Sequence, residues 1–533
     1  MEKRNKLNGS LLSLWFLSLL VSIGRDIPEN LASTARLDLS ADTSVASLAN
    51  GQFIAGFGSI TRKNWETNQT AGYTVAFPIT HFAPREVSLR FTPLGSGTVA
   101  LSLMGPYEKN AEGAVLKQEI VWEQISITGA KSDGPSAGMS NLRSWHDAPL
   151  RRVLRVAGGK PVTIQARARA VIPAGFQEMR RIEDTNSPAH QALQKFLRGA
   201  NLGNYLEAPP NQNWGATYSA RDFLHLRGEG FDHARLPIAW HHYSGSGPEF
   251  KLSAEIFSKV DFLVTNAIAN HLAVIVNLHH FDSFTAAPAA NTNKFYAIWR
   301  QVAAHYARYP AALAFEILNE PKDAATTTLL NPIYAETIRL IRESNPNRTI
   351  FVGPGRWNSI DELTQLKLPD DDRNLVVTVH CYEPFYFTHQ GATWSGPETK
   401  ITGIQFPGPP SRPLVPGESL QPSANVAAWL KRYNSEPRDI NPSSPAAFRP
   451  KLQSSGEWSA YYGRPVHVGE FGCYIKADPE SRVNFYREFR KGCEEFGLAW
   501  AIWDWKAGFK YWDDQADRAL PGMHEALFGA KGR

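Results

Sequence analysis

The chain has 533 residues, of which 43% are hydrophobic and 20% are charged. This balance excludes a disordered or fibrous chain, and the length favours either two domains or one enlarged barrel. The formal net charge is +5, and it falls to +3 without residues 1–24, which hold three basic residues and one glutamate. So small an excess gives no reason to expect nucleic acid or an anionic membrane as a partner.

The first 24 residues have the pattern of a secretory signal peptide. Basic residues within the first six positions precede an apolar stretch at 11–23, and Ser22 and Gly24 have the spacing that signal peptidase prefers. The stretch is too short for a comfortable transmembrane helix, which disfavours an uncleaved anchor. We therefore expect a secreted protein, extracellular or periplasmic, without membrane association after cleavage.

The cysteine content limits cross-linking and metal binding. Only Cys381, Cys473 and Cys493 are present, and none of them lies in a C-x-x-C pair. This odd count excludes a disulfide framework, and the spacing gives no support to a structural zinc site. We expect free thiols, no metal and no cofactor, and we expect a monomer.

Residues 45–172 have an all-β pattern. Short strand-like runs alternate with glycine, proline, asparagine and aspartate, and in the run 162–170 apolar and polar residues alternate with period two. We interpret this segment as a β-sandwich, jelly-roll-like, of the size of one domain. It is either a carbohydrate-binding module, with aromatic residues such as Trp65, Tyr107, Trp122 or Trp145 as its platform, or a stabilising companion. Residues 173–195 read as a linker with a short helix at its end.

Residues 196–533 have the pattern of an α/β fold. Eight buried, strand-like runs alternate with segments of helical periodicity, which predicts a parallel (β/α)₈ barrel, the TIM-barrel fold. A long connection rich in proline, glycine and serine, Gly391 to Ser455, separates the sixth and seventh strands. A connection of that length is usually functional or disordered, and on the C-terminal rim of a barrel it would border the cleft.

Two glutamates close strand-like runs of this barrel. Glu320 ends the predicted fourth strand and Glu470 the seventh, so they face each other across the mouth of the barrel. Paired carboxylates are the working groups of a glycosidase: one gives a proton to the departing sugar oxygen, and the other meets the developing oxocarbenium ion in its ionised form. Either glutamate alone would read as a surface carboxylate.

Other strand ends supply partners for the two acids. Arg235 can hold Glu470 ionised through charge-assisted hydrogen bonds, with a purely structural ion pair as the alternative. Asn319 can bind the sugar 2-hydroxyl, where hydrogen bonding tightens in the transition state, unless it is only a turn residue.

Three further residues belong to the same set. Tyr382 can donate a hydrogen bond to the nucleophile, and His380 can buffer the acid, although isolated residues of these types more often serve the core. Trp503 offers a flat face for a pyranose ring, and a core position is its alternative. The set as a whole favours a sugar site.

His279 and His280 raise the question of a metal. The two histidines are adjacent on a predicted strand, so we expect their side chains to point to opposite faces and not to bind one ion together.

With these strand-end residues, residues 196 to about 520 resemble glycoside hydrolase family 5, the cellulase-like family of retaining (β/α)₈ glycosidases. The matching segments are 198–204, 235–237, 278–280, 318–321, 380–385, 387–390, 469–472 and 503–505. The resemblance implies that Glu320 is the acid/base and Glu470 the nucleophile. It also implies that the −1 sugar is bound by Arg235, His279, His280, Asn319, His380, Tyr382 and Trp503.

The resemblance leads us to expect an endo-acting β-1,4-glucanase that hydrolyses a polysaccharide with retention of configuration. A β-mannanase or another β-glucanase of the same family is the nearest alternative. A non-hydrolytic carbohydrate-binding protein on a degenerate barrel is the alternative from another class, and the intact Glu320, Glu470 and Tyr382 speak against it.

Overall fold

The computed structural model describes residues 53–57, 75–91, 93, 96–105, 117, 119–132, 139–172, 178–417, 420 and 422–529. The chain divides into two compact units, with main segments Phe53–Pro173 and Ala174–Arg533. The expected signal peptide lies outside the described residues. Within the described part, no helix has both the length and the apolar character needed to cross a membrane.

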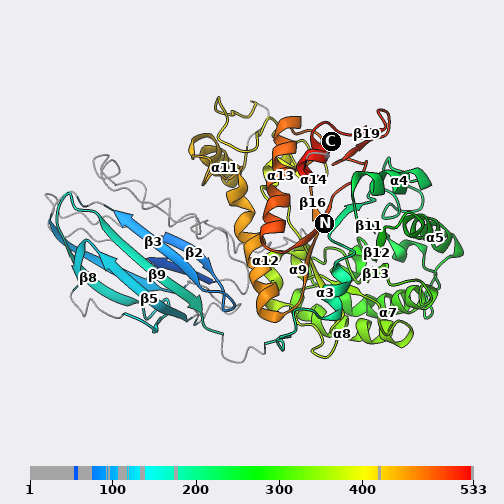
Figure 1. Cartoon of the computed structure of the whole chain (residues 1–533), viewed down its shortest axis with the longest axis horizontal. Helices are drawn as coiled ribbons and strands as arrows, with labels where there is room; N and C mark the ends of the chain where they lie inside the picture. Colours follow the sequence, from blue (N-terminus) through cyan, green and yellow to red (C-terminus); the bar gives the residue numbers. More distant parts are fainter. Residues whose placement is uncertain are drawn as a thin grey trace, which may run out of the picture. The chain divides into compact units, whose positions relative to one another are not determined.

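The first unit contains two antiparallel sheets (Figure 1), with strand orders β2-β1-β4-β8-β6 and β3-β9-β5-β7. Side chains from both sheets, such as Leu101 and Leu154 from one and Ile164 from the other, share one hydrophobic core. In β9 every second residue is buried, as expected for a sheet with one wet face. The described strands are β1 (Phe53–Phe57), β2 (Val75–Ile79), β3 (Arg85–Phe91), β4 (Gly97–Met104), β5 (Ile120–Thr128), β6 (Ala130–Ser132), β7 (Leu142–Ser144), β8 (Leu150–Val156) and β9 (Val162–Ala170).

The aromatic residues considered as a sugar platform in this unit differ in burial. Trp122 is fully buried in the shared core, and its indole Nε1 donates to Ser144 Oγ at 2.8 Å. Trp145 is half-buried. Trp65 and Tyr107 lie outside the described residues. Trp122 is therefore a core residue and not part of an exposed platform.

The second unit is a closed barrel of eight parallel strands in chain order, β10 to β17, which confirms the predicted (β/α)₈ architecture. Runs such as Ala273–Asn277 and Leu375–His380 are buried along their whole length, as expected where helices cover the outside of a parallel sheet. The strands are β10 (Arg198–Asn201), β11 (His233–Leu236), β12 (Ala273–Asn277), β13 (Leu313–Glu316), β14 (Ile350–Val352), β15 (Leu375–His380), β16 (Val466–Phe471) and β17 (Ala499–Ile502).

Helices surround this barrel (Figure 1). The longer helices begin with a side-chain cap or with proline in the first turn. For example, the Ser253 side chain accepts from Ile256 N at the start of α5, and Pro288 is the first residue of α7. The described α-helices are α3 (Pro188–Leu193), α4 (Ala220–Glu229), α5 (Ala254–Ala269), α6 (Asp282–Ala286), α7 (Pro288–His305), α8 (Thr327–Ser344), α9 (Gly355–Asn358), α10 (Phe385–Thr388), α11 (Ala424–Ser435), α12 (Arg449–Tyr462), α13 (Pro479–Glu495) and α14 (Met523–Phe528). Short 3₁₀ turns lie at Trp240–Tyr243, Ile360–Gln365, Pro397–Lys400 and Pro445–Ala447, and a two-stranded ribbon joins β18 (Trp512–Asp513) to β19 (Arg518–Ala519).

A bulge in β16 aims Glu470 into the mouth of the barrel. Val379 pairs with Val468, but the next residue, His380, pairs with Glu470, so Gly469 is the extra residue. A side chain at Gly469 would approach Thr378 Oγ1 to 2.6 Å, so the bulge requires glycine here. The bulge thus brings Glu470 beside His380.

Both predicted connecting segments contain more structure than their composition suggests, and the short helix expected at the end of the first is α3. Residues 178–195 of the expected linker belong to the barrel unit: Ile182 N donates to Tyr462 O at 3.0 Å, and α3 buries Ala189 and Leu193 in a core cluster that includes Ile275 of β12. The connection Gly391 to Ser455 borders the cleft as predicted, because Trp394, Ser395 and Lys451 line it. It is not one irregular loop, since it contains α11 and the first half of α12.

Candidate active site

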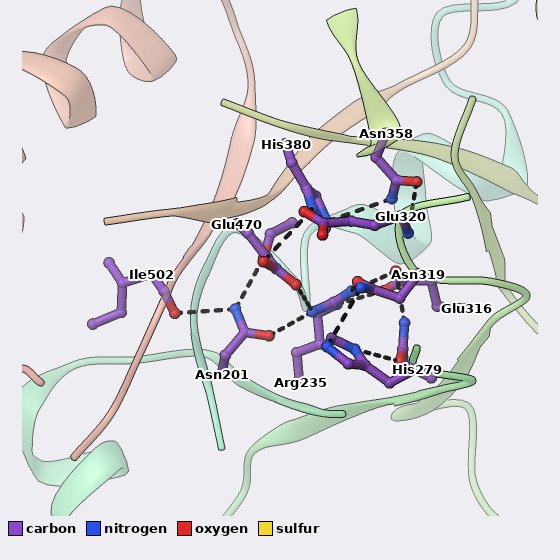
Figure 2. A network of polar contacts seen from close by, with 12 residues as sticks. Asn201, Arg235, His279, Glu316, Asn319, Glu320, Asn358, His380, Glu470 and Ile502 are labelled. Atoms are coloured by element: carbon purple, nitrogen blue, oxygen red, sulfur yellow. Dashed lines mark hydrogen bonds and ion pairs between the residues drawn. The ribbon is translucent and has the colours of Figure 1, made fainter. Parts of the chain in front are cut away.

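Arg235 is fully buried in β11 and donates to four side chains at the mouth of the barrel (Figure 2). Its Nε and Nη2 form a bidentate pair with Glu316 at 2.6 and 2.7 Å, and its Nη1 donates to Glu470 Oε1 at 2.7 Å. Nη1 also donates to Asn201 Oδ1, and Nη2 to Asn319 Oδ1, both at 2.7 Å. Burial acts against this charge, but Glu316 and Glu470 outweigh it and raise the pKa of Arg235. A permanent positive charge therefore lies beside Glu470.

Glu470 is buried and held at both oxygens. Arg235 binds Oε1, and the Tyr382 hydroxyl, which follows the end of β15, donates to Oε2 at 2.9 Å. Burial raises the pKa of Glu470, while His380, Arg235 and the Tyr382 hydroxyl act in the opposite direction. The two hydrogen bonds favour the ionised form of this carboxylate.

Glu320 lies beside Glu470, four residues beyond the last residue of β13 rather than at the strand end itself. His380 Nδ1 is 2.7 Å from Glu320 Oε1 and 3.6 Å from Glu470 Oε2. One such atom from each of the three residues lies within 4.8 Å of the others. Within the described residues this is the one set with the spacing of metal ligands, and it consists of the acid pair itself with His380.

Glu320 has the environment of a carboxylic acid. Burial raises the pKa of Glu320 to about 7, although the charges of Arg235 and Lys322 act to lower it. The carboxyl of Glu320 therefore holds a proton near neutral pH, while Glu470 receives charge-assisted bonds. The two environments separate the acids, as two roles in catalysis require.

Asn358 joins Glu320 to His380 (Figure 2). Glu320 N donates to Asn358 Oδ1 at 3.2 Å, and Asn358 Nδ2 lies 3.4 Å from His380 Nε2. The Asn358 side chain is fully buried.

His279 lies under the aromatic face of the site. Its ring is stacked on Trp503, with centroids 5.7 Å apart and planes at 8°. His279 Nδ1 is 3.1 Å from Asn277 Oδ1, and Nε2 is 3.4 Å from Asn319 Nδ2. Burial holds the pKa of His279 well below its ordinary value, so the ring is neutral.

The expectation that His279 and His280 point to opposite faces was wrong. β12 ends at Asn277, so both histidines lie in the loop beyond the strand, where strict alternation no longer applies. Their rings meet edge to face with centroids 4.0 Å apart, and both residues line the cleft.

The acids lie in a large cleft with a volume of about 1120 Å³. All the predicted site residues except Arg235 and Asn319, which lie beneath its floor, belong to its lining. Several aromatic side chains line the cleft, and two of them are more than half exposed, Trp357 at 54% and Trp394 at 60%. The aromatic lining comprises Trp214, Trp357, Tyr382, Phe385, Trp394, Trp503 and Phe509. Such surfaces suit the apolar faces of sugar rings.

The cysteines are free, as expected. Cys381, Cys473 and Cys493 are all buried and form no disulfide. Burial raises the pKa of Cys473 to about 12, so this thiol is a poor nucleophile.

Sequence reasoning did not single out Glu316, Asn201 and Asn358. A charged residue inside an apolar run needs a buried partner, and this signal could have identified Glu316 as the partner of Arg235. Asn201 ends β10 and donates to the carbonyls of Gly469 and Ile502 at 2.9 and 3.0 Å. The sequence indicated it only as one residue of the matching segment 198–204, without a role of its own. Asn358 follows a short strand at some distance and gave no signal of its own.

Glu207 and Asp504 were also missed. Both carboxyls are buried at the cleft and accept backbone N–H groups of their own loops, Glu207 from Tyr205 at 2.9 Å and Asp504 from Phe509 at 3.1 Å. Burial raises the pKa of Glu207 to about 7 and that of Asp504 to about 6. They organise the loops that follow β10 and β17.

Several curated relatives of the chain are named endoglucanases. It is similar to Endoglucanase H of Acetivibrio thermocellus, with 27% identity over 314 residues that cover 59% of this chain and 30% of that protein. It is also similar to Endoglucanase 3 of Fibrobacter succinogenes, with 28% identity over 382 residues that cover 67% of this chain and 56% of that protein. The chain thus spans less than a third of the length of the first relative and little more than half of the length of the second.

Solved structures show the same likeness. Thermotoga maritima Cel5A in complex with cellobiose is 31% identical, with a TM-score of 0.54, and the match covers 63% of this chain and 99% of that one. The same protein in complex with mannotriose is 32% identical, with a TM-score of 0.53 and coverage of 63% and 98%. The sequence model described as Cellulase (glycosyl hydrolase family 5) matches residues 195–508. The chain belongs to glycosyl hydrolase family 5, the cellulase family.

Proposed function

We propose that this chain is a retaining endo-β-1,4-glucanase with Glu320 as acid/base and Glu470 as nucleophile. The observation that carries the proposal is the spacing of the two acids, whose nearest oxygens lie within 4.8 Å. Retaining glycosidases keep the two carboxyl groups about 5–5.5 Å apart, whereas inverting enzymes need about 6.5–9.5 Å to admit a water molecule between acid and sugar. The close pair supports a double displacement.

In the first step a Glu470 oxygen attacks the anomeric carbon while the glycosidic C–O bond breaks, and Glu320 gives its proton to the departing oxygen. A glycosyl ester of Glu470 remains. In the second step Glu320, now ionised, takes a proton from water, and the water oxygen attacks the anomeric carbon and releases Glu470. Two inversions give net retention, and both acids regain their starting protonation.

The remaining residues of the site have supporting roles in this proposal. Arg235 and Tyr382 keep Glu470 ionised and oriented through the bonds described above. Asn319, whose Oδ1 accepts from Arg235 and whose Nδ2 lies 3.4 Å from His279 Nε2, is proposed to bind the sugar 2-hydroxyl. Trp503 offers its face to the −1 ring, and His279, His280 and His380 line the same subsite.

The proposed substrate is a β-1,4-glucan chain. The two relatives described above are named endoglucanases, and the large cleft with exposed Trp357 and Trp394 fits a polymer that extends beyond the reacting sugar. A β-mannanase is the second candidate, because Thermotoga maritima Cel5A has been captured with both cellobiose and mannotriose.

Reducing-sugar release from purified glucans, mannans and xylans tests the substrate, and a fall in the viscosity of a soluble glucan tests endo action. We expect release from β-1,4-glucan that Glu470→Gln abolishes. A higher kcat/KM on mannan would favour the second candidate. No release from any polymer by a folded protein would favour a non-hydrolytic binding protein.

We propose that residues 45–172 form a β-sandwich, jelly-roll-like, that serves as a structural companion of the enzyme. Its two antiparallel sheets with one shared core, and the burial of Trp122 in that core, support this role. A carbohydrate-binding role is the alternative. Pull-down of the full chain and of a chain lacking residues 45–172 with insoluble cellulose or mannan separates the two, because only a binding module would make the retained fraction depend on the domain.

We also propose that residues 1–24 are a cleaved signal peptide and that the mature enzyme is a secreted monomer. The basic start and apolar stretch of this segment support export. The intact mass of the protein recovered outside the cell, together with its elution volume, tests both points; a mass that includes residues 1–24 would contradict cleavage.

A further inference from the structure

Glu320, Asn358 and His380 form a closed ring of hydrogen bonds. The backbone N of Glu320 donates to Asn358 Oδ1 at 3.2 Å, Asn358 Nδ2 lies 3.4 Å from His380 Nε2, and His380 Nδ1 lies 2.7 Å from Glu320 Oε1. The ring starts on the main chain of Glu320 and returns to its own carboxyl group (Figure 2).

The direction of every bond in the ring follows from its first member. A backbone N–H can only donate, so the Asn358 atom that faces it is the carbonyl oxygen, and the amide nitrogen must face His380. An amide nitrogen can only donate, so His380 Nε2 accepts. The ring of His380 is neutral, because burial lowers the pKa of His380 to about 4, and its single proton is therefore on Nδ1.

The loop that carries Asn358 is shaped for this contact. Asn358 has φ of 54°, in the left-handed region that asparagine tolerates better than most residues. A Cβ at Gly353 would lie 2.6 Å from Asn358 Nδ2, so only glycine leaves room for the amide. Trp357 N donates to Pro321 O at 3.0 Å, which ties the same loop to the residue after Glu320.

We propose that Asn358 is a positioning residue for acid catalysis, because it fixes His380 as the Nδ1–H tautomer. With that tautomer Glu320 Oε1 accepts from the ring, so the acidic proton must sit on Oε2, where it is free for the departing glycosidic oxygen. With the opposite tautomer Nδ1 would be an acceptor and would draw the proton to Oε1, away from the substrate. Once Glu320 has given up its proton, the Nδ1–H bond stabilises the carboxylate until water returns a proton.

This inference rests on the proposed role of Glu320, and the kinetic test uses the leaving group to isolate that role. A nitrophenolate with a low pKa departs without a proton, whereas a sugar alcohol needs one. Asn358→Gly removes the amide and suits the left-handed backbone. We expect it to lower kcat/KM on cellotetraose by about 10-fold to 100-fold, the scale of partial loss of acid catalysis, and by less than about 3-fold on 2,4-dinitrophenyl β-cellobioside.

Asn345→Leu is the matched control. Asn345 is a buried asparagine that does not line the cleft, and its Nδ2 donates to Ala303 O at 2.7 Å. Any fall in its activity should be the same for both substrates. Equal losses for both substrates in Asn358→Gly would overturn the proposal. If Glu320→Ala itself showed no dependence on the leaving group, the proposed role of Glu320 would fail instead, and the two failures are thus distinguishable.

The second variant reports the tautomer directly. Asn358→Asp keeps an acceptor for Glu320 N but places an oxygen opposite His380 Nε2, which must then carry a proton. Nitrogen NMR of the ¹⁵N-histidine-labelled enzyme should show a protonated Nδ1 and an unprotonated Nε2 for His380 in the native enzyme, and a protonated Nε2 in the variant. The signal is assigned by its loss in His380→Gln. A native enzyme with the proton on Nε2 would contradict the proposal.

Discussion

Arg235 Nη1 donates to Glu470 Oε1, with 2.7 Å between the two atoms. Glu316 binds the other edge of the same guanidinium, through Nε and Nη2. The bidentate partner fixes the plane of the guanidinium, so its remaining N–H groups are aimed before substrate arrives. Arg235 and Glu316 are fully buried, which strengthens the pair and makes an unpaired member costly. Glu316 therefore acts through Arg235 on Glu470, the proposed nucleophile.

Glu316→Gln should destabilise the fold and weaken catalysis together. The substitution leaves a buried arginine with one anionic partner, and breaking such a pair costs about 3–5 kcal/mol. Urea unfolding measures the loss of stability. The exposed pair Arg449–Glu495, with N···O at 2.6 Å, is the control: Glu495→Gln should cost less than about 1 kcal/mol. Equal effects of the two substitutions would contradict the account.

The alkaline limb of the pH–rate profile should report Glu320. In its proposed role as the acid Glu320 must be protonated, so kcat/KM on cello-oligosaccharides should fall as the pH rises through about 7, the pKa to which burial raises Glu320. Lys322 lowers this pKa, and removal of its charge in Lys322→Gln should move the alkaline limb to higher pH. A limb that moves to lower pH, or does not move, would show that another group controls it.

Glu320 should also lower the free energy of unfolding at neutral and alkaline pH. Its pKa in the folded state is about 7 and its ordinary value is 4.5, so the unfolded chain loses this proton first. The folded state is therefore penalised increasingly as the pH rises between these two values. Glu320→Gln should raise the unfolding free energy relative to the native enzyme at pH 8 by more than at pH 4. A stability difference that does not change with pH would contradict the raised pKa.

His233 and His467 should make the barrel sensitive to acid. Their rings are fully buried with centroids 5.2 Å apart, and none of the four ring nitrogens has a hydrogen-bond partner among the described residues. Burial lowers the pKa of His233 to about 3 and that of His467 well below its ordinary value. The unfolded chain therefore takes up protons first, and stability is lost as the pH falls below 6.5.

His467→Leu should remove part of this loss. At pH 8 both histidines are neutral, so the difference from the native enzyme reports packing alone. Between pH 6.5 and pH 4 the variant should gain relative to the native enzyme in the unfolding free energy measured with urea. A difference that stays constant over this range would show that His467 does not titrate on unfolding.

The main features of the fold and site could be predicted from the sequence. Eight buried runs with helices between them indicated the barrel, and strand-end glutamates in such a fold indicated the acid pair, because parallel strands bring their ends to one face. Tyr382 and Arg235 do contact Glu470 as expected. These contacts depend only on strand ends and residue chemistry.

Features that depend on loop geometry could not be predicted. His279 and His280 follow the end of β12, so the alternation expected of a strand failed there. Asn358 reaches the site through a left-handed turn, for which asparagine beside tryptophan gives no clear signal. The contacts of Glu178 and Ile182 with α12 pair segments far apart in sequence, and composition alone made this stretch look like a linker.

A covalent trap tests the central claim most directly. A 2-deoxy-2-fluoro-β-cellobioside with a dinitrophenolate leaving group forms the glycosyl ester readily but releases it slowly, because the fluorine destabilises the oxocarbenium-like transition states. Mass spectrometry of the digested enzyme should then find one fluorocellobiosyl group on the peptide that contains Glu470, attached to its side chain. An adduct on Glu320, or rapid release of product with no adduct at any time, would contradict the assignment of Glu470 as nucleophile.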